Sequence, residues 1–261
     1  MVLRIQGTIF MPLLFRALSA ILVFFAAEGS ANAAELSLAD LASRLDYTWI
    51  LVAAGLVLLM QIGFLLLEAG SVRTKNAVNV AQKNLLDLAF AVLAFYTVGF
   101  MIGFAPSSAD MPIGFDAKLL FLNDITPHDA VFFIFQVMFC GTAATIISGA
   151  VAERMKLSAY VVLSVLTAAV IYPVFVQWAW GSARGDNSGA WLANMGYVDF
   201  AGSTVVHATG GWIALAACLI LKPREGRFDE AGRPVRFTGH SPVLTAAGTL
   251  LLFVGWIGVN G

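Results

Sequence analysis

The sequence predicts an all-α polytopic membrane protein, and three observations support that fold class. Of the 261 residues, 59% are hydrophobic and 12% are charged, which is about half the charged share of an ordinary soluble domain. The mean hydropathy is +0.84. Six long segments contain no Asp, Glu, Lys or Arg. Because a soluble protein of this size needs more charge to cover its surface, we expect the chain to lie in a lipid bilayer.

Residues 1–33 have the pattern of a signal peptide. Arg4 and Arg16 precede an apolar run at 17–27, and the small residues of 31–33 (ANA) suit a cleavage site. The run is shorter than the roughly 20 residues that a membrane-spanning helix needs. A first membrane anchor is the alternative, and Met11 is an alternative start. Residues 34–46 are expected to form a short extracytoplasmic segment.

The remainder, 47–261, is predicted to be a transmembrane domain of six spans. Each span has enough residues to cross about 30 Å of hydrocarbon as an α-helix. The six charge-free segments are 47–67, 88–109, 130–152, 157–183, 200–221 and 237–261.

Basic residues in the loops predict the orientation. The opposite loops hold only Lys118 and Arg184. The positive-inside rule places the basic set in the cytoplasm and the mature N-terminus outside a cell (inner) membrane. That set comprises ten residues: Arg73, Lys75, Lys83, Arg154, Lys156, Lys222, Arg224, Arg227, Arg233 and Arg236.

Several function classes are excluded by what the sequence lacks. It has no basic stripe with interleaved aromatic residues, so nucleic-acid binding is not expected. It has no phosphate-binding glycine loop and no nucleophile elbow, so an enzyme is not expected. Cys140 and Cys218 lie in apolar runs and suggest neither a metal nor a cofactor. Residues 237–261 end without a polar anchor, so we expect a fragment cut within or at the edge of a sixth helix.

Two polar residues of the fifth span are the first candidates for a function. His207 lies about 10–12 Å below the outer end of that span at 1.5 Å per residue. A polar side chain at that depth suggests a pore-lining, proton-handling group, although a hydrogen bond to a neighbouring helix would also explain it. Asp199 precedes the span and is expected to cap the helix. Its charge would also attract cations to the outer mouth.

Aromatic residues on two other spans are further candidates. Phe135 and Phe139 are one turn apart on the third span, and Trp180 ends the fourth. Periodicity alone favours core packing or an interfacial belt. Their ring faces would nevertheless attract a partly dehydrated cation. Glu68 and Arg73, at the end of the first span, are interpreted as interfacial charges that pair locally.

Four segments, in this order along the chain, resemble motifs of the ammonium transporter family. The most specific is 199–207 (DFAGSTVVH). The others are 73–76 (RTKN), 149–154 (GAVAER) and 255–260 (GWIGVN). The resemblance covers about residues 46 to 261. It implies an eleven-helix fold with an inverted repeat, assembled as a homotrimer with one pore in each subunit. The chain matches the first repeat and the start of the following helix.

The resemblance also assigns roles to the five candidates. Phe139 matches the outer phenylalanine of the gate and Phe135 its neighbour. Trp180 matches the tryptophan of the external ammonium site. Asp199 matches the family aspartate near that site, and His207 matches the first of two pore histidines.

The chain departs from the family pattern at several positions. Val259 stands where the inner gate phenylalanine is expected, and Ser203 replaces a glycine of the signature. The external-site serine and the second histidine would lie beyond Gly261. As written, the fragment is therefore not expected to form a complete pore.

The implied function is an ammonium channel or transporter that recruits ammonium and conducts it after deprotonation. Ammonium resembles a lysine head group, which stays charged at neutral pH with a pKa of about 10.4. The bilayer centre opposes an ion by at least about a few kcal/mol but does not oppose neutral ammonia. Passing the proton to an imidazole would select ammonium over sodium or potassium, which have no proton to release.

The alternative function is the ammonium-sensing module of a signalling protein, because some relatives carry cytoplasmic signalling domains. The expected partners are ammonium or ammonia, the lipid bilayer, further copies of the chain and a cytoplasmic PII-type signal protein.

Overall fold

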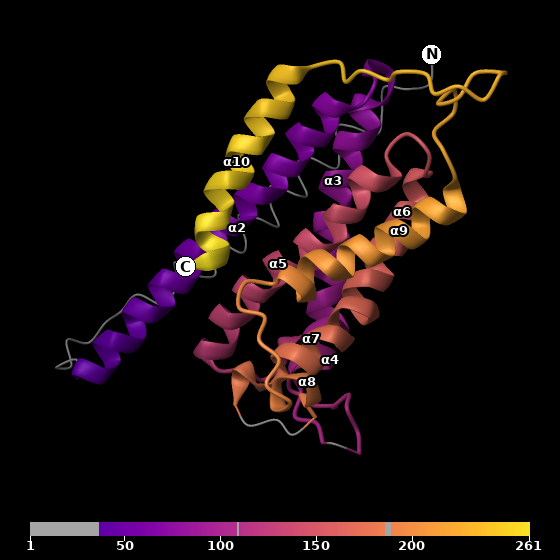
Figure 1. Ribbon diagram of the computed structural model, residues 1–261. Helices are drawn as coiled ribbons and strands as arrows, with labels where there is room; N and C mark the ends of the chain where they lie inside the picture. The colour runs from indigo at the N-terminus through magenta and orange to yellow at the C-terminus, as the bar shows by residue number, and fades with distance from the viewer. Residues whose placement is uncertain (1–36, 109, 186–188) are drawn as a thin grey trace, which may run out of the picture. The chain divides into compact units, whose positions relative to one another are not determined.

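The computed structural model describes residues 37–108, 110–185 and 189–261 (Figure 1). The chain divides into two units, 1–44 and 45–261, and the site lies in the second. Apart from two isolated bridges, the described residues form helices, turns and loops, so the all-α class is confirmed. The predicted signal peptide, 1–33, lies outside the described residues.

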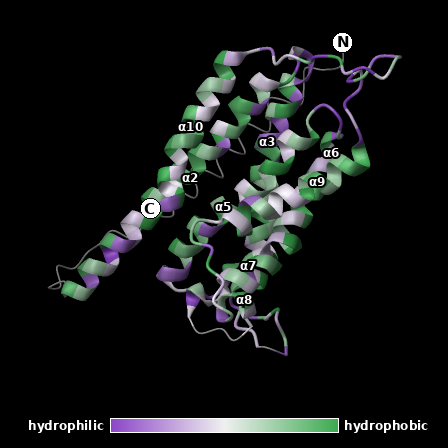
Figure 2. Cartoon of the chain, viewed as in Figure 1, coloured by the Kyte–Doolittle hydropathy of each residue, from purple (hydrophilic) through white to green (hydrophobic). Residues whose placement is uncertain are grey.

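Six helices are long and apolar enough to span a bilayer, as predicted. They run over Leu38–Ser71, Thr74–Phe104, Pro127–Val151, Leu157–Arg184, Ser203–Leu221 and Pro242–Asn260. Figure 2 shows that these helices are mainly hydrophobic, whereas hydrophilic residues are frequent in the connecting loops.

Three of the spans contain a π-helical segment. The first span is α2 (Leu38–Ser71), the third α5 (Pro127–Val151) and the sixth α10 (Pro242–Asn260). The second consists of α3 (Thr74–Ala94), η1 (Phe95–Gly99) and α4 (Phe100–Phe104). The fourth consists of α6 (Leu157–Leu166), η3 (Thr167–Ile171), α7 (Tyr172–Trp180) and η4 (Gly181–Arg184). The fifth consists of η5 (Ser203–Ala208) and α9 (Thr209–Leu221). The connecting loops hold η2 (Leu120–Leu122) and α8 (Trp191–Asn194).

The prediction of the second span was wrong at its start. The helix begins at Thr74, not at residue 88, and it includes Lys83 and Asp87, both 0% exposed. A search for charge-free segments excludes these residues, because it cannot know that other helices supply polar partners for them. Lys83 is therefore not one of the loop residues to which the positive-inside rule applies. The first helix also extends beyond its expected bounds, since it begins at Leu38 within the segment 34–46.

Ion pairs define the two ends of the bundle. At one end, which we call the Trp180 end, the Arg184 guanidinium bonds to the Asp129 carboxylate at 2.7 Å and to the Phe104 carbonyl at 3.2 Å. At the other, the Arg73 end, Arg73 and Arg224 both bond to Glu153. Successive spans therefore alternate in direction, as the sequence predicted.

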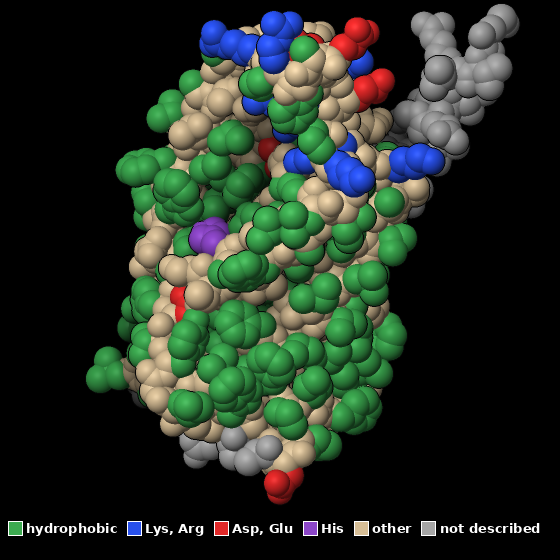
Figure 3. Space-filling view, turned by 45° about the vertical axis from the view of Figure 1, so that its right-hand side comes forward, with side chains coloured by type: hydrophobic (Ala, Val, Ile, Leu, Met, Phe, Trp, Pro, Cys, Tyr) green, Lys and Arg blue, Asp and Glu red, His purple; other side chains and the backbone are tan. Residues whose placement is uncertain are grey.

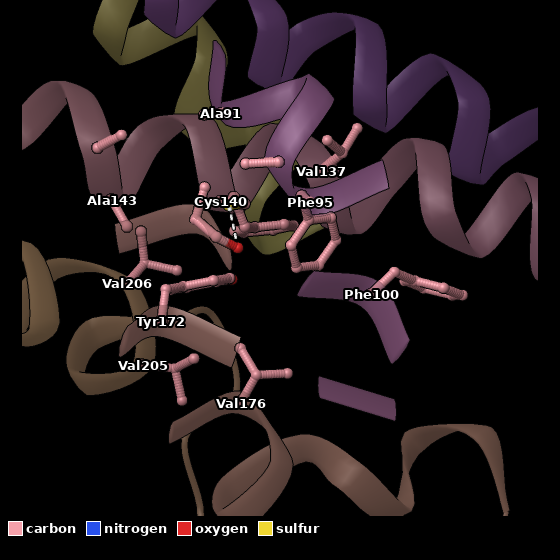
Figure 4. Close-up of a cluster of buried hydrophobic side chains, with 14 of the residues drawn as sticks. Ala91, Phe95, Phe100, Val137, Cys140, Ala143, Tyr172, Val176, Val205 and Val206 are labelled. Carbon is pink, nitrogen blue, oxygen red and sulfur yellow. Dashed lines mark hydrogen bonds between the residues drawn. The ribbon is translucent and has the colours of Figure 1, made fainter. Parts of the chain in front are cut away.

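The main core lies where α5, α7 and the π-helical segments meet (Figure 4). Phe95, Cys140 and Tyr172 are fully buried there, and Cys140 Sγ lies 4.0 Å from the Ala168 carbonyl. Val205 and Val206 of η5 point into the same core. This burial anchors η5 against the other helices and so fixes the position of His207.

Helix α10 runs beside α2, and glycines allow the close approach (Figure 1). A Cβ on Gly63 would lie only 2.9 Å from Leu252 Cγ, and one on Gly258 would lie 2.6 Å from Leu56 Cβ. Small residues at such crossings are typical of helix packing in membranes. The 255–260 motif thus contacts the first span, and Val259 packs against the edge of the main core.

Candidate functional site

The structure brings the three aromatic candidates together. The Phe135 and Phe139 rings meet edge to face, with centroids 4.8 Å apart and an interplanar angle of 83°. The Phe139 ring packs against Trp180 of α7 in the same manner, at 5.9 Å and 79°. Phe139 is buried, whereas Phe135 and Trp180 are partly exposed. The spacing on α5 thus predicted a shared face, and the fold adds Trp180 to it.

Trp180 is held by the turn that precedes the fifth span. Its indole Nε1 donates a hydrogen bond to the Asp199 carbonyl at 2.6 Å. In the same turn, Gly202 has φ +90°, a conformation that side chains disfavour. A Cβ on Gly202 would also lie 2.6 Å from Val206 Cγ2 and 3.2 Å from the Trp180 ring. Gly202 is therefore required both by the backbone conformation and by the close approach of the indole.

The Asp199 carboxylate caps the fifth span, as the sequence predicted. Oδ1 accepts the backbone N–H groups of Gly202 and Ser203, and Oδ2 accepts those of Thr204 and Val205 together with the Thr204 hydroxyl. Burial by itself raises the pKa of Asp199, but these hydrogen bonds outweigh it and hold the pKa below its ordinary value. Attraction of a cation by this charge stays a prediction, whereas its role as a cap follows directly from the contacts.

His207 is the fifth residue of the span, because the helix begins at Ser203 and not at residue 200. Its backbone N–H bonds to the Gly202 carbonyl at 3.0 Å, as a π-helix requires. The imidazole is half-buried and makes no hydrogen bond to any residue that the structure describes. The alternative explanation of this histidine was a hydrogen bond to a neighbouring helix. No such bond is present within the described part of the chain.

Sequence reasoning missed a polar contact that joins two motifs at the Arg73 end. The Glu153 carboxylate accepts hydrogen bonds from Arg73 Nε at 2.9 Å, Asn76 Nδ2 at 2.8 Å and Arg224 Nη1 at 3.3 Å. Burial opposes ionisation, but the bonds from Arg73 and Asn76 lower the pKa of Glu153 to about 2. The sequence did contain a signal for this contact, because Glu153 is an acidic residue within one motif and Arg73 is a basic residue within another. The interpretation of Glu68 as an interfacial charge was wrong, because this side chain is buried in the bundle.

A sequence model of the Ammonium Transporter Family matches residues 48–261. The chain belongs to the ammonium transporter family. The Synechocystis protein sll0537 is 46% identical over 225 residues, a match that covers 84% of this chain and 41% of the relative. The ammonium transporter Amt2 of Archaeoglobus fulgidus is 41% identical, with 82% of this chain and 46% of the relative covered.

Among solved structures, the Sensor Amt Protein has a TM-score of 0.79 and is 39% identical. That match covers 83% of this chain and 54% of the other. The resemblance inferred from the four motifs is therefore confirmed, and the chain is a multi-pass membrane protein of this family. It spans about half the length of the curated relatives that it matches.

Proposed function

We propose that this chain supplies half of an ammonium channel or transporter, with a transport role and no catalytic one. The observation that carries the proposal is a row of contacts from Phe135 through Phe139 and Trp180 to the Asp199 turn. That turn leads directly into η5, which holds His207. Partly exposed aromatic faces at the Trp180 end suit the recruitment of a cation, at roughly 0.5–2 kcal/mol for each ring.

His207 is the residue proposed to handle the proton. A neutral imidazole can donate from one nitrogen and accept on the other. Its ring nitrogens lack a hydrogen-bond partner in the described part of the chain, so they remain available to a permeating molecule. Ammonium that gives up its proton here crosses the apolar interior as ammonia, which avoids the free energy of placing an ion there.

Ammonium uptake by the full-length protein tests this function. Proteoliposomes that contain the protein should accumulate ammonium and methylammonium well above empty liposomes, with no comparable uptake of sodium or potassium. Uptake at the level of empty liposomes would contradict a transport function.

A sensing function is the second candidate, because the Sensor Amt Protein shares this fold at 39% identity. A sensor would bind ammonium without carrying it. If the full-length protein shows ammonium-dependent stabilisation but no uptake, the sensing function replaces transport. The homotrimer and a cytoplasmic PII-type partner are proposed on the family resemblance alone.

We also propose that the Arg73 end faces the cytoplasm of an inner membrane and that the mature N-terminus lies outside. Basic side chains gather at one end of the face in Figure 3. Only Lys118 and Arg184 lie between the spans at the Trp180 end. Nine basic residues lie at the Arg73 end: Arg73, Lys75, Arg154, Lys156, Lys222, Arg224, Arg227, Arg233 and Arg236.

Thiol labelling of intact cells tests this orientation. In a background without Cys140 and Cys218, a membrane-impermeant reagent should label Met195→Cys at the Trp180 end. It should leave Arg233→Cys unlabelled until the cells are opened. Both native side chains are well exposed, so access to each thiol depends on the side of the membrane. The reverse labelling pattern would overturn the proposed orientation.

A further inference from the structure

A cluster of polar side chains is buried where α2, α3, α5 and α6 meet, and it includes none of the candidate site residues. Each member is at most 5% exposed. We call it the buried polar cluster, and its members are Glu68 of α2, Lys83, Asn84 and Asp87 of α3, Thr145 and Ser148 of α5, and Tyr160 of α6.

Glu68 has the contacts of an ionised acceptor. Its Oε2 accepts hydrogen bonds from the Ser148 hydroxyl at 2.7 Å and from Asn84 Nδ2 at 3.0 Å. The Asn84 amide is oriented for this by the Thr145 hydroxyl, which donates to Asn84 Oδ1 at 2.9 Å. Two donors converging on one oxygen stabilise a carboxylate.

Asp87 is placed differently, and counting hydrogens shows why. The Tyr160 hydroxyl oxygen lies 2.5 Å from Asp87 Oδ2 and 3.0 Å from the Ala144 carbonyl. A tyrosine has one O–H to donate, and a carbonyl can only accept. Both contacts are complete hydrogen bonds if Tyr160 donates to Ala144 and Asp87 donates to Tyr160. Asp87 must then carry a proton.

The charge balance leads to the same assignment. Glu68 and Tyr160 are the titratable side chains that act on Asp87, and Lys83 lies one turn earlier on α3, beside the Tyr160 ring. Helix α5 brings hydroxyls and the Ala144 carbonyl. One ammonium group among two carboxylates would leave a net negative charge in the membrane interior, which is costly. Asp87 Oδ1 and Lys83 Nζ also lack hydrogen-bond partners among the described residues. An unpartnered oxygen is tolerated far better on a neutral acid than on a carboxylate.

We propose that the buried polar cluster is a proton-binding site in which Asp87 holds the proton as a neutral carboxylic acid. Glu68 remains ionised, and the Lys83 ammonium, 5.8 Å from the centre of the Tyr160 ring, balances its charge. The proton comes from solvent as the helices assemble, and no other group changes its charge. The acid joins α3 to α6 through Tyr160, and α6 to α5 through the Ala144 carbonyl. This proposal does not depend on the proposed transport function.

Infrared spectroscopy of the purified full-length protein tests the assignment. The wild type should show the carbonyl band of a protonated carboxylic acid at neutral pH. Asp87→Asn should lose this band and still fold, because the amide preserves the shape, the neutrality and the ability to donate to Tyr160. Glu68→Gln and Asp129→Asn, which alter carboxylates that accept hydrogen bonds, should retain it. A band that persists in Asp87→Asn, or no such band in the wild type, would overturn the proposal.

Two further measurements keep the test decisive if Asp87→Asn does not fold. Tyr160→Phe keeps the ring beside Lys83 but removes the hydroxyl, so it should shift the acid band; an unchanged band contradicts the contact. Wild-type thermal stability should fall as the pH rises, because the folded state binds a proton that the unfolded state releases. If sodium or potassium instead raises the stability relative to a bulky cation at equal ionic strength, a bound cation neutralises the cluster and the proposal fails.

Discussion

Replacing His207 with alanine in the full-length protein should lower ammonium uptake by about tenfold or more, because a positioned proton acceptor contributes at least that much to a proton transfer. The alternative result for this variant is a change of selectivity, in which the wider, wetter path lets the intact cation pass. His207→Asp should differ from both, since a carboxylate holds a cation but cannot donate and accept as a neutral imidazole does.

Uptake of ammonium, methylammonium and potassium into proteoliposomes measures these effects, alongside recovery of the folded oligomer in detergent. His128→Ala is the matched control, because that histidine is exposed at the start of α5 and should be dispensable. Folding should be retained in both His207 variants, since the ring is half-buried and makes no hydrogen bond to a described residue. If both His207 variants assemble normally and their uptake rate and selectivity are unchanged, His207 is a packing residue and has no role in transport.

Replacing Glu153 with glutamine should destabilise the protein by about 1–3 kcal/mol, less than for a fully buried ion pair, because both guanidinium groups are partly exposed. The Glu153 side chain is 0% exposed and pairs with both Arg73 and Arg224. Glutamine leaves two guanidinium groups without their counter-charge. Glu225→Gln is the matched control, because it makes the same change at an exposed position of the loop that carries Arg224.

The pH dependence provides a second check on Glu153. Its pKa is lowered from 4.5 to about 2 in the fold, so the carboxylate stabilises the protein above pH 4.5. This contribution should disappear as the pH falls from 4.5 towards 2. Thermal unfolding in detergent across that interval should therefore converge for the wild type and Glu153→Gln. Curves that stay parallel, or an equal loss in Glu225→Gln, would contradict the assigned role.

Several features of this protein could be predicted from the sequence because they depend on local patterns. An apolar segment long enough to cross the bilayer is expected to form a helix, because lipid offers no hydrogen-bond partner to a backbone amide. The six spans, the shared face of Phe135 and Phe139 and the cap at Asp199 all follow from spacing along one element. The family likewise followed from the order and sequence of short motifs.

Only the tertiary structure decided which charges lie inside the membrane and which partners they have. Lys83 and Glu68 resembled interfacial charges, yet both are buried, because Asn84, Ser148 and Tyr160 from three helices supply the surroundings they need. Arg73 pairs with Glu153, which is distant in the sequence. The free energy of a buried charge is set by its neighbours across helices, and a pattern along a single helix does not contain them.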